Sequence, residues 1–572
     1  MDSINRRTFI KSAGTVAALG AAGVGTALAD EAAAGKVAAD TEGVWAFEIP
    51  PAPIPDDQIV ATYDAQVVVI GSGVAGLVCG ARLSEELGDK VMLVSAGHGP
   101  VSRGGSNHGI GTKTLLEEGL GYTAETCTEF IKGQLAMNSF AVDQKKWYRW
   151  INTSAESMNW VIDLMESRGY KTTIEQGYTD PDGIFTMPES SHGWIGTGVE
   201  DASLSGETLL VNTMRDYILE NGGQIFWGHR AEQLIREDDN TGRVSGFVAK
   251  NDDGEYVRFN ASQAVVMATG DFSKDRDMIR RYCPVVEPLC TFEEPDFDGG
   301  LFGGLQPGDG QKMGLWVGAA WQRIQPMAPM VQSCHGTDEG PSTCFMMAFT
   351  GLMLDEQGER FMSEDITKPF LAYKCLFQKN PGYWAIWNAD YAYSQDLWYP
   401  GFLGGQSIET DSHIVIAKEP PELQLSHWDE SVDLGYYQKA DTLEELLAKI
   451  EHPDPEAALA SIARYNELCA AGCDEDFHKN PEFMVPVDKG PFYGMNYKLS
   501  YLNFLTVMGG LRTNVNMQVC EEDDTPIEGL YNIGTMVGDF YSNMYTFMAC
   551  GQNLGATCIT FAYDVAKDLC QA

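Results

Sequence analysis

The chain has 572 residues, and its 39 lysine and arginine residues against 81 aspartate and glutamate residues give a formal charge of -42 at pH 7. A surface this acidic repels nucleic acid and anionic lipid, which argues against a nucleic-acid-binding protein. A chain of this length also exceeds one ordinary hydrophobic core, so we expect two domains.

The N-terminus has the pattern of a twin-arginine export signal. Arg6 and Arg7 precede a mildly apolar stretch rich in alanine and glycine, and Ala27–Ala29 suits cleavage before Asp30. The stretch is too short and too rich in glycine for a stable membrane span. We therefore expect residues 1–29 to be a signal peptide and the mature protein to work in the periplasm or cell envelope, with no integral membrane span.

Residues 30–61 are rich in alanine and proline and predict an extended arm. The apolar run that follows leads directly into a G-x-G-x-x-G turn formed by Gly71, Gly73 and Gly76. In such a turn the first glycine permits a tight bend, the second a close approach to a pyrophosphate, and the third close helix packing. A helix over about 75–87 and a strand over 91–94 complete a βαβ unit, so the sequence predicts a dinucleotide-binding site.

One residue of this unit departs from the usual pattern. An acidic residue normally ends the second strand and binds the ribose hydroxyls, but Ser95 stands here. A hydroxyl can still bond a ribose, without the charge.

Further elements follow from hydrophobic patterns along the chain. We expect helices over about 121–167, 206–221 and 553–567, strands near 224–227, 231–236, 243–249, 264–267 and 529–534, and a strand at 383–387. The strand at 264–267 ends in a turn at Thr269 and Gly270, and a polar stretch rich in tyrosine and tryptophan covers about 321–505.

Several weak motifs occur in an order that is typical of one family. They are the glycine turn at 71–76, Ala268-Thr269-Gly270 with Phe272, Gly308-Asp309-Gly310, residues 358–364, Arg464-Tyr465-Asn466, Pro491-Phe492-Tyr493, residues 508–511 and residues 529–534. Together they resemble the FAD-dependent fumarate reductase, succinate dehydrogenase and 3-ketosteroid dehydrogenase superfamily over nearly the whole mature chain, and in particular its exported reductases of anaerobic respiration.

The resemblance implies an α/β fold with two domains. A Rossmann-like FAD-binding domain of the glutathione-reductase type would comprise residues 62–320 and 506–572, and an inserted α+β capping domain would comprise residues 321–505.

The resemblance also implies FAD as the cofactor. The start of the C-terminal helix would point at the pyrimidine edge of the flavin and favour the negative charge of its reduced form, and residues 104–107 would run under the flavin ring. A second usual acid is missing where Thr535 follows Gly534. The residues expected to contact FAD are Gly71, Gly73, Val74, Ala75, Gly76, Ser95, Gly105, Ser106, Ala231, Thr269, Gly270, Gly534, Thr535, Asn553 and Leu554.

The catalytic positions depart from a fumarate reductase, which clamps two carboxylates with histidines and arginines. By the spacing of the family motifs, those positions hold Thr506, Ala328 and Ala549, and the proton-donating arginine is replaced by Lys368. One lysine cannot make the bidentate contact of an arginine. Fumarate is therefore not expected as a substrate.

Aromatic and hydroxyl groups remain near the expected site: Tyr541, Met544, Tyr545, Phe547 and Met548. Such a pocket suits an apolar or aromatic substrate with one polar group. We expect Tyr545 to bond a carbonyl or enolate oxygen, Lys368 or Tyr545 to deliver a proton, and Tyr541 to be a third candidate. The alternative is that both tyrosines only pack and that Lys368 is a solvated surface charge.

No metal site is predicted. His98, His108, His192 and His335 fall in expected loops without metal-ligand spacing, although His108 lies near the flavin loop. The 13 cysteines are scattered, and no C-x-x-C-H haem motif occurs.

Three functions remain open. The first is an exported flavin reductase of an electron-poor C=C bond that takes electrons from a separate donor such as a cytochrome. The second runs the reverse desaturation, as a 3-ketosteroid dehydrogenase does. The third is a non-catalytic flavin- or ligand-binding protein, suggested by Ser95 and Thr535.

Overall fold

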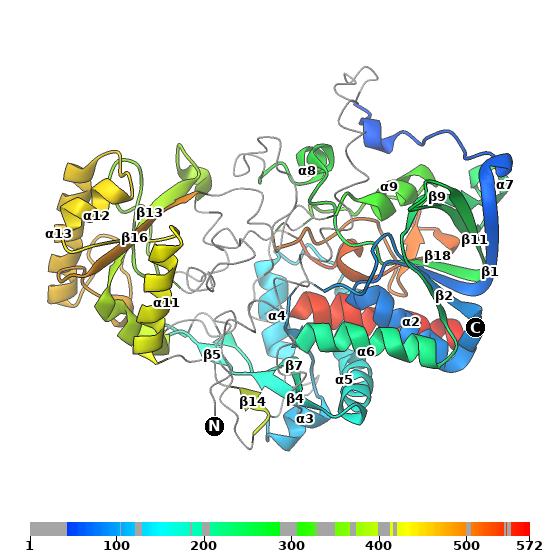
Figure 1. Cartoon of the computed structure of the whole chain (residues 1–572), viewed down its shortest axis with the longest axis horizontal. Helices are drawn as coiled ribbons and strands as arrows, with labels where there is room; N and C mark the ends of the chain where they lie inside the picture. Colours follow the sequence, from blue (N-terminus) through cyan, green and yellow to red (C-terminus); the bar gives the residue numbers. More distant parts are fainter. Residues whose placement is uncertain are drawn as a thin grey trace.

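The structure is a computed structural model that shows two lobes joined by a smaller sheet (Figure 1). It describes residues 43–102, 104–120, 128–183, 186–196, 206–286, 306–326, 328, 349–365, 373, 375–397, 412–415, 420–498, 505–542, 545 and 551–571. None of the helices in these ranges is long and apolar enough to cross a membrane.

The larger lobe is built on an eight-stranded sheet. Its main path runs β17-β18-β11-β1-β2-β8, and β10 joins β11 to β9. The strands are β1 Ile59–Ile70, β2 Val91–Val94, β8 Gln224–Phe226, β9 His229–Arg236, β10 Val244–Asn251, β11 Tyr256–Met267, β17 Gln518–Cys520 and β18 Pro526–Asn532. β1 pairs in parallel with β2 and β11, and β11 pairs in parallel with β18. Strands from both ends of the chain therefore share one sheet.

A helix that is buried over most of its length packs on this sheet. Helix α2 (Val74–Leu87) contacts α6 (Gly206–Glu220) and α14 (Phe561–Gln571), and Figure 1 shows the three helices side by side below the sheet. A Cβ at Gly80 would lie 2.9 Å from Ile218 Cδ1 of α6. Glycine at this position therefore sets how closely the two helices approach.

The smaller lobe has its own four-stranded sheet in the order β12-β13-β16-β15. The strands are β12 Leu352–Leu354, β13 Gly382–Asn388, β15 Gln438–Ala440 and β16 Phe492–Lys498, and the helices α11 Pro421–Asp433, α12 Leu443–Lys449 and α13 Pro455–Ala471 lie around them. The strand expected at 383–387 lies in β13. Its Trp387 is buried against Trp428 and Tyr437, with ring centroids 5.9 and 5.1 Å away.

A third sheet connects the two parts of the chain, in the order β14-β4-β7-β3. Its strands are β3 Asn107–His108, β4 Tyr170–Glu175, β7 Ser191–Gly196 and β14 Ile414–Val415, and a hairpin of β5 Tyr178–Thr179 and β6 Thr186–Met187 lies nearby. β14 belongs to the expected cap, yet it pairs in parallel with β4 of the expected FAD domain. The two expected domains therefore share a sheet.

The remaining helices are mostly short. They are α3 Lys113–Glu117, α4 Thr128–Met137, α5 Gln144–Ser167, α7 Glu237–Asn240, α8 Arg276–Tyr282, α9 Asp309–Trp316, the 3-10 helices η1 Ala46–Glu48, η2 Asp56–Gln58, η3 Gly88–Lys90, η7 Cys375–Phe377, η8 Ala389–Leu397, η10 Pro481–Phe483 and η12 Gly534–Met536, and the π-helix η13 Asn553–Thr560.

The helical pattern expected over 121–167 is interrupted in the structure. Residues 121–127 lie outside the described ranges, and the rest forms two helices, α4 and α5, with a break between them. Ser139 and Phe140 both have φ of 55°, in the left-handed region, and the Asp143 side chain caps α5 by accepting a hydrogen bond from Lys145 N at 3.0 Å. The hydrophobic pattern continues through the break and therefore does not indicate where α4 ends and α5 begins.

The expected arm is shorter than 30–61, because β1 already begins at Ile59. Of the arm, residues 43–58 lie in the described ranges and contact the larger lobe. Trp316 Nε1 donates to Phe47 O at 2.9 Å, and Ile54 N donates to Gln233 Oε1 at 3.0 Å.

A buried ionic network supports the smaller lobe. Arg360 makes two hydrogen bonds of 2.8 and 2.9 Å to Glu364, and its NH2 also lies 2.8 Å from Asp474 Oδ2. Lys479 Nζ lies 3.4 Å from Glu364 Oε2. Burial raises the pKa of Asp474, but the bonds from Arg360 outweigh it and bring the pKa to about 2. These contacts fix residues 360–364 against Asp474 and Lys479 of the same lobe.

Candidate active site

The glycine turn after β1 requires two of its glycines for steric reasons. Gly71 has φ of 113°, and a Cβ there would lie 2.3 Å from Ala268 O. A Cβ at Gly76 would lie 1.9 Å from Gly71 O. Any side chain at either position would push the turn away from β11 or from the first turn of α2.

Gly73 differs, because a Cβ there would meet no protein atom within 4 Å. Gly73 is the N-cap of α2, and no side chain caps this helix. The first-turn N–H groups and the partial positive charge of the helix start therefore face open space, which is the usual setting for a bound phosphate. Val74 and Ala75 form this first turn.

Ser95, at the end of β2, is held by its neighbours. Its Oγ lies 2.8 Å from Ser72 Oγ and accepts from Gly97 N at 3.2 Å, while Ser72 Oγ donates to Gly99 O at 3.2 Å. Either hydroxyl can be the donor between Ser72 and Ser95, and if Ser72 gives its proton to Gly99 O, Ser95 donates to Ser72. The Ser95 oxygen can then only accept a further bond, such as one from a ribose hydroxyl.

Ala231 lies beside this edge. At the start of β9, His229 N donates a hydrogen bond to Ser95 O at 2.8 Å. This hydrogen bond keeps the start of β9 next to the end of β2. Ala231 is buried two residues further on.

Two further turns meet the same edge. Ala268 N donates to Ile70 O at 2.8 Å, and Ile533 N donates to Met267 O at 2.9 Å, so β1, β11 and β18 end together. The turn at Thr269 and Gly270 follows β11, and Gly534 and Thr535 follow β18. A Cβ at Gly534 would lie 3.0 Å from the Cβ of Ala75 in the first turn of α2.

The expected flavin loop packs on the start of the C-terminal helix. His108 N donates to Gly551 O at 3.2 Å, and a Cβ at Gly551 or Gly555 would lie 2.0 Å from Ser106 O or 1.9 Å from His108 O. Gly104 faces Leu554, and Gly105 has open space around it. The helix expected from residue 553 begins as a π-helix, which widens it where the loop lies against it.

The cradle fits FAD. Besides the open space at Gly73, the buried polar atoms that have no hydrogen-bond partner within the described ranges include Asn107 Oδ1 in the flavin loop and Gln552 Nε2 before the helix. Buried polar atoms without partners are rare in proteins, and an acceptor and a donor at this position match the polar edge of a flavin. Gly71, Gly73, Gly76 and the α2 start would hold the pyrophosphate, and the 104–107 loop with Asn553 and Leu554 would hold the ring.

Helices α4 and α5 clamp the segment that carries Tyr541. Lys146 Nζ donates to Gly538 O at 2.6 Å, Asp143 N to Asp539 O at 2.7 Å and Trp147 Nε1 to Phe540 O at 2.7 Å. Three successive carbonyl groups are thus bound by one end of α5. Asn138, at the end of α4, accepts a hydrogen bond from Ser542 N at 3.0 Å and completes the clamp.

Tyr541 and Tyr545 lie against each other in the interior. Their ring centroids are 5.4 Å apart with an interplanar angle of 88°, and each side chain is 3% exposed. The Tyr541 hydroxyl has no hydrogen-bond partner among the described residues. Burial, and then the neighbouring Tyr545, raises the pKa of Tyr541 well above its usual value, so this phenol keeps its proton near neutral pH and can donate a hydrogen bond.

Two of the positions where the family has cations hold uncharged side chains here. Thr506 Oγ1 donates to the buried carboxylate of Asp271 at 2.7 Å, and Ala328 is buried in the core. Lys368 and Ala549 lie outside the described ranges, as do Met544, Phe547, Met548 and His335. The role of Lys368 therefore stays a prediction.

The expectation that His108 and His192 sit in loops is wrong. They lie in β3 and β7, where His108 Nδ1 is 2.8 Å from Ser190 Oγ and His192 Nε2 is 2.8 Å from Thr112 Oγ1. Burial lowers the pKa of His108 to about 3 and that of His192 to about 4. Both are neutral near pH 7. Within the described ranges, no group of histidine, cysteine and acidic side chains could hold a metal ion.

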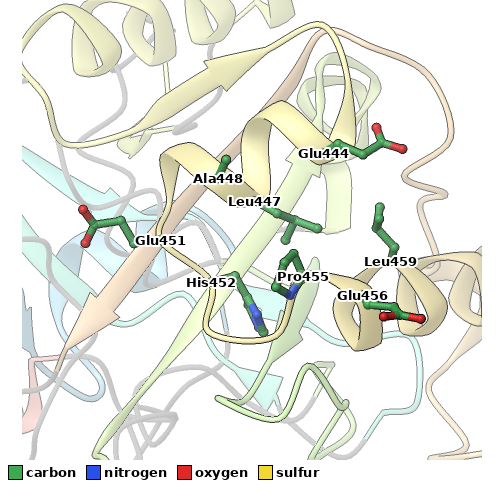
Figure 2. A pocket seen from close by; sticks show the side chains of 8 residues that line it. All are labelled: Glu444, Leu447, Ala448, Glu451, His452, Pro455, Glu456 and Leu459. Carbon is green, nitrogen blue, oxygen red and sulfur yellow. The ribbon is translucent and has the colours of Figure 1, made fainter.

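A separate cleft of about 390 Å³ lies in the smaller lobe between α12 and α13. Figure 2 shows Leu447, Pro455 and Leu459 facing its interior and Glu444 at its rim. His452 lines it, but one ring nitrogen is 3.0 Å from Asp355 O and the other accepts from Asp454 N at 3.1 Å. None of the residues expected to bind FAD or substrate lines this cleft.

Comparison with known proteins places this site in a family. The model of the FAD binding domain family matches residues 66–551, and the chain belongs to that family. FAD is therefore its cofactor, and the resemblance to the fumarate reductase and 3-ketosteroid dehydrogenase superfamily is confirmed.

Two relatives match over most of their length. The vinyl phenol reductase of Lactiplantibacillus plantarum is 25% identical over 88% of this chain and 94% of its own. The digoxin reductase of Eggerthella lenta is 23% identical over 97% of this chain and 95% of its own. The crystal structure of 3-ketosteroid Δ1-dehydrogenase from Sterolibacterium denitrificans superposes with a TM-score of 0.65 at 16% identity, over 89% of this chain and 99% of that one.

These matches confirm the α/β fold and the enzyme class, an FAD-dependent oxidoreductase acting on CH–CH groups. They argue against the third function considered from the sequence, a non-catalytic binding protein.

We predict that Gly73→Val abolishes FAD binding and leaves the fold intact. The added side chain meets no protein atom at its Cβ but enters the space in front of the α2 start. FAD content of the purified protein is measured from its visible absorption. Gly133→Val is the matched control, because a Cβ at Gly133 also meets no atom within 4 Å. A Gly73→Val protein that retains stoichiometric FAD would contradict the assigned cradle.

Proposed function

We propose that this protein reduces an activated C=C bond in an apolar or aromatic substrate that carries one oxygen as its polar group. The double bond would be conjugated to a carbonyl group or to an aromatic ring, as in an enone, an aryl enoate or a vinyl phenol. The observation that carries the proposal is the buried Tyr541–Tyr545 pair, whose Tyr541 hydroxyl has no partner among the described residues. The vinyl phenol reductase and the digoxin reductase to which this chain is similar support the same class of substrate.

In the proposed reaction, the cofactor, the tyrosine pair and Lys368 have separate roles. FAD, when bound, supplies the hydride that adds to one carbon of the double bond. Tyr541 donates a hydrogen bond to the substrate oxygen, where negative charge develops during the reaction. The α4–α5 clamp fixes residues 538–542 and so fixes the position of this donor. Lys368 or Tyr545 would deliver the proton to the other carbon.

Fumarate fits poorly, because a dicarboxylate needs fixed cations. Thr506 is bonded to Asp271, and Ala328 carries no charge. The electrons would come from a separate donor, for which a cationic redox protein such as a cytochrome suits the charge of -42 on this chain.

The second candidate is the reverse reaction, a desaturation next to a ketone. The tyrosine pair favours it as much, because the same hydrogen bond to a carbonyl oxygen stabilises the enolate that forms when a neighbouring C–H bond breaks. The solved 3-ketosteroid Δ1-dehydrogenase shares the fold.

We predict that the protein, with reduced viologen as electron donor, reduces at least one member of a panel of enones, aryl enoates and 4-vinylphenol, and turns fumarate over negligibly. Oxidation of the viologen is measured by its colour. The same protein with saturated 3-ketosteroids and an artificial electron acceptor tests the reverse direction. Fast fumarate reduction would contradict the proposed substrate class. Turnover of the saturated 3-ketosteroids alone would favour the desaturase.

We predict that Tyr541→Phe lowers kcat by about 100- to 1,000-fold, the usual cost of removing one donor to a developing oxyanion. The change removes a buried hydroxyl that has no described partner, so Tm is not expected to fall. Tyr545→Phe is the matched comparison, since both variants keep the ring contact.

A larger loss in Tyr545→Phe than in Tyr541→Phe would assign the donor to Tyr545, as first expected from the sequence. If both variants with full FAD content lose less than roughly threefold, far below the usual cost of a lost donor, the tyrosines only pack and Lys368 becomes the leading candidate.

We also propose that the protein is exported by the twin-arginine route. The support is the pattern at residues 1–29, which lie outside the described ranges. We predict that replacing both Arg6 and Arg7 by lysine leaves the protein, with FAD bound, in the cytoplasmic fraction. The unchanged protein is expected in the periplasmic or envelope fraction, and its retention in the cytoplasm would contradict the proposal.

A further inference from the structure

Two acidic side chains, Glu207 and Glu175, accept hydrogen bonds from the flavin loop. The Asn107 side-chain amide donates to Glu207 Oε1, and Ser102 Oγ donates to Glu207 Oε2 at 3.5 Å. Ser106 Oγ donates to Glu175 Oε1. Neither glutamate was singled out in the sequence, and neither has a place in the proposed reaction.

Glu207 is the more deeply buried of the two. It lies in the first turn of α6 and is 2% exposed. Burial, which outweighs the bonds from Asn107 and Ser102, raises the pKa of Glu207 to about 7, and the nearby Glu175 acts in the same direction. The hydroxyl of Ser102 is half-buried and connects this carboxyl toward the surface.

Further titratable groups lie on β3, β7, β4 and α2. His108 in β3 and His192 in β7 are neutral, because burial lowers both pKa values far below 7. Helix α2 carries its charged residues at the other end of α6, where Glu85 accepts from the Tyr217 hydroxyl at 2.9 Å. Glu175 in β4 accepts the hydrogen bond from Ser106.

We propose that Glu207 takes up a proton when the bound flavin is reduced and thereby links the reduction potential of FAD to pH. The loop that Glu207 holds is the one expected under the flavin ring, and Asn107 connects the two through its amide. The inference rests on the FAD cradle of the proposed function.

Two electrons from the external donor and one proton from solvent reduce the flavin and leave one additional negative charge on the ring. That charge strengthens proton binding at the nearby carboxylate, because like charges at short distance disfavour each other. Glu207 then takes a second proton from solvent, by way of Ser102, and becomes a neutral acid. On reoxidation the proton is released.

The first test is the reduction potential of the bound FAD as a function of pH, measured by spectroelectrochemistry. For a two-electron couple, each proton taken up lowers the potential by about 30 mV per pH unit. Above about pH 7, where Glu207 is ionised in the oxidised protein, we expect twice this slope in the unchanged protein. Below that pH, only one proton is taken up per two electrons, and the slope falls to about 30 mV per pH unit. Glu207→Gln keeps an acceptor for Asn107 and is expected to show the one-proton slope throughout.

Glu220→Gln is the matched control, because Glu220 lies at the far end of the same helix and pairs with Arg168 at the surface. It is expected to behave as the unchanged protein. Equal slopes in the unchanged protein and in Glu207→Gln would overturn the proposal.

The second test needs no variant and decides the matter if Glu207→Gln does not fold. A reduced-minus-oxidised infrared difference spectrum above pH 7 is expected to gain the C=O band of a protonated carboxyl, which shifts in heavy water. No such band would overturn the proposal. A purified protein without FAD would instead contradict the proposed function, so the two failures are distinguishable.

Discussion

Close contact between glycine turns at one edge of the main sheet is the constraint on which the site depends. β1, β11 and β18 end there, and the chain leaves each strand at Gly71, Gly270 or Gly534. Because side chains are absent, the turn at Gly71 reaches the backbone of Ala268, and Gly534 reaches Ala75. The same rule continues at Gly551 and Gly555, which bring the C-terminal helix against the flavin loop. A site made from distant parts of the chain is thus assembled by backbone contact.

The parts of this arrangement that the sequence predicts are those with local signals. The glycine spacing at 71–76 and the apolar strand at 91–94 define a βαβ unit within about thirty residues, the usual length of such a unit. The break between α4 and α5 does not show in the hydrophobic pattern, because apolar residues continue through it and only the Asp143 cap marks it. That break is also what lets Asp143, Lys146 and Trp147 bind three successive carbonyl groups before Tyr541.

Burial of polar residues is what the sequence predicts least well. His108 lies in β3, whose two residues are too few for a detectable alternation, and His192 lies near the start of the six-residue strand β7. Glu175 and Glu207 resemble ordinary surface glutamates, since glutamate is almost never fully buried. Their environment comes from a sheet whose strands are far apart in the chain. The acids missing at Ser95 and Thr535 are visible in the sequence, whereas the acids beneath the flavin loop are visible only in the fold.

The pairing of β14 with β4 has a mechanical meaning for the enzyme. Ile174 N donates to His413 O at 2.8 Å, so a short strand from the middle of the smaller lobe's sequence is bonded to the residue next to Glu175. Glu175 in turn holds Ser106 in the flavin loop. Backbone pairing transmits displacement along its hydrogen bonds, so a shift of β14 is carried to β4 and then to the loop. Residues 412–415, which belong to the expected cap, are therefore connected through β4 to the loop that carries Ser106.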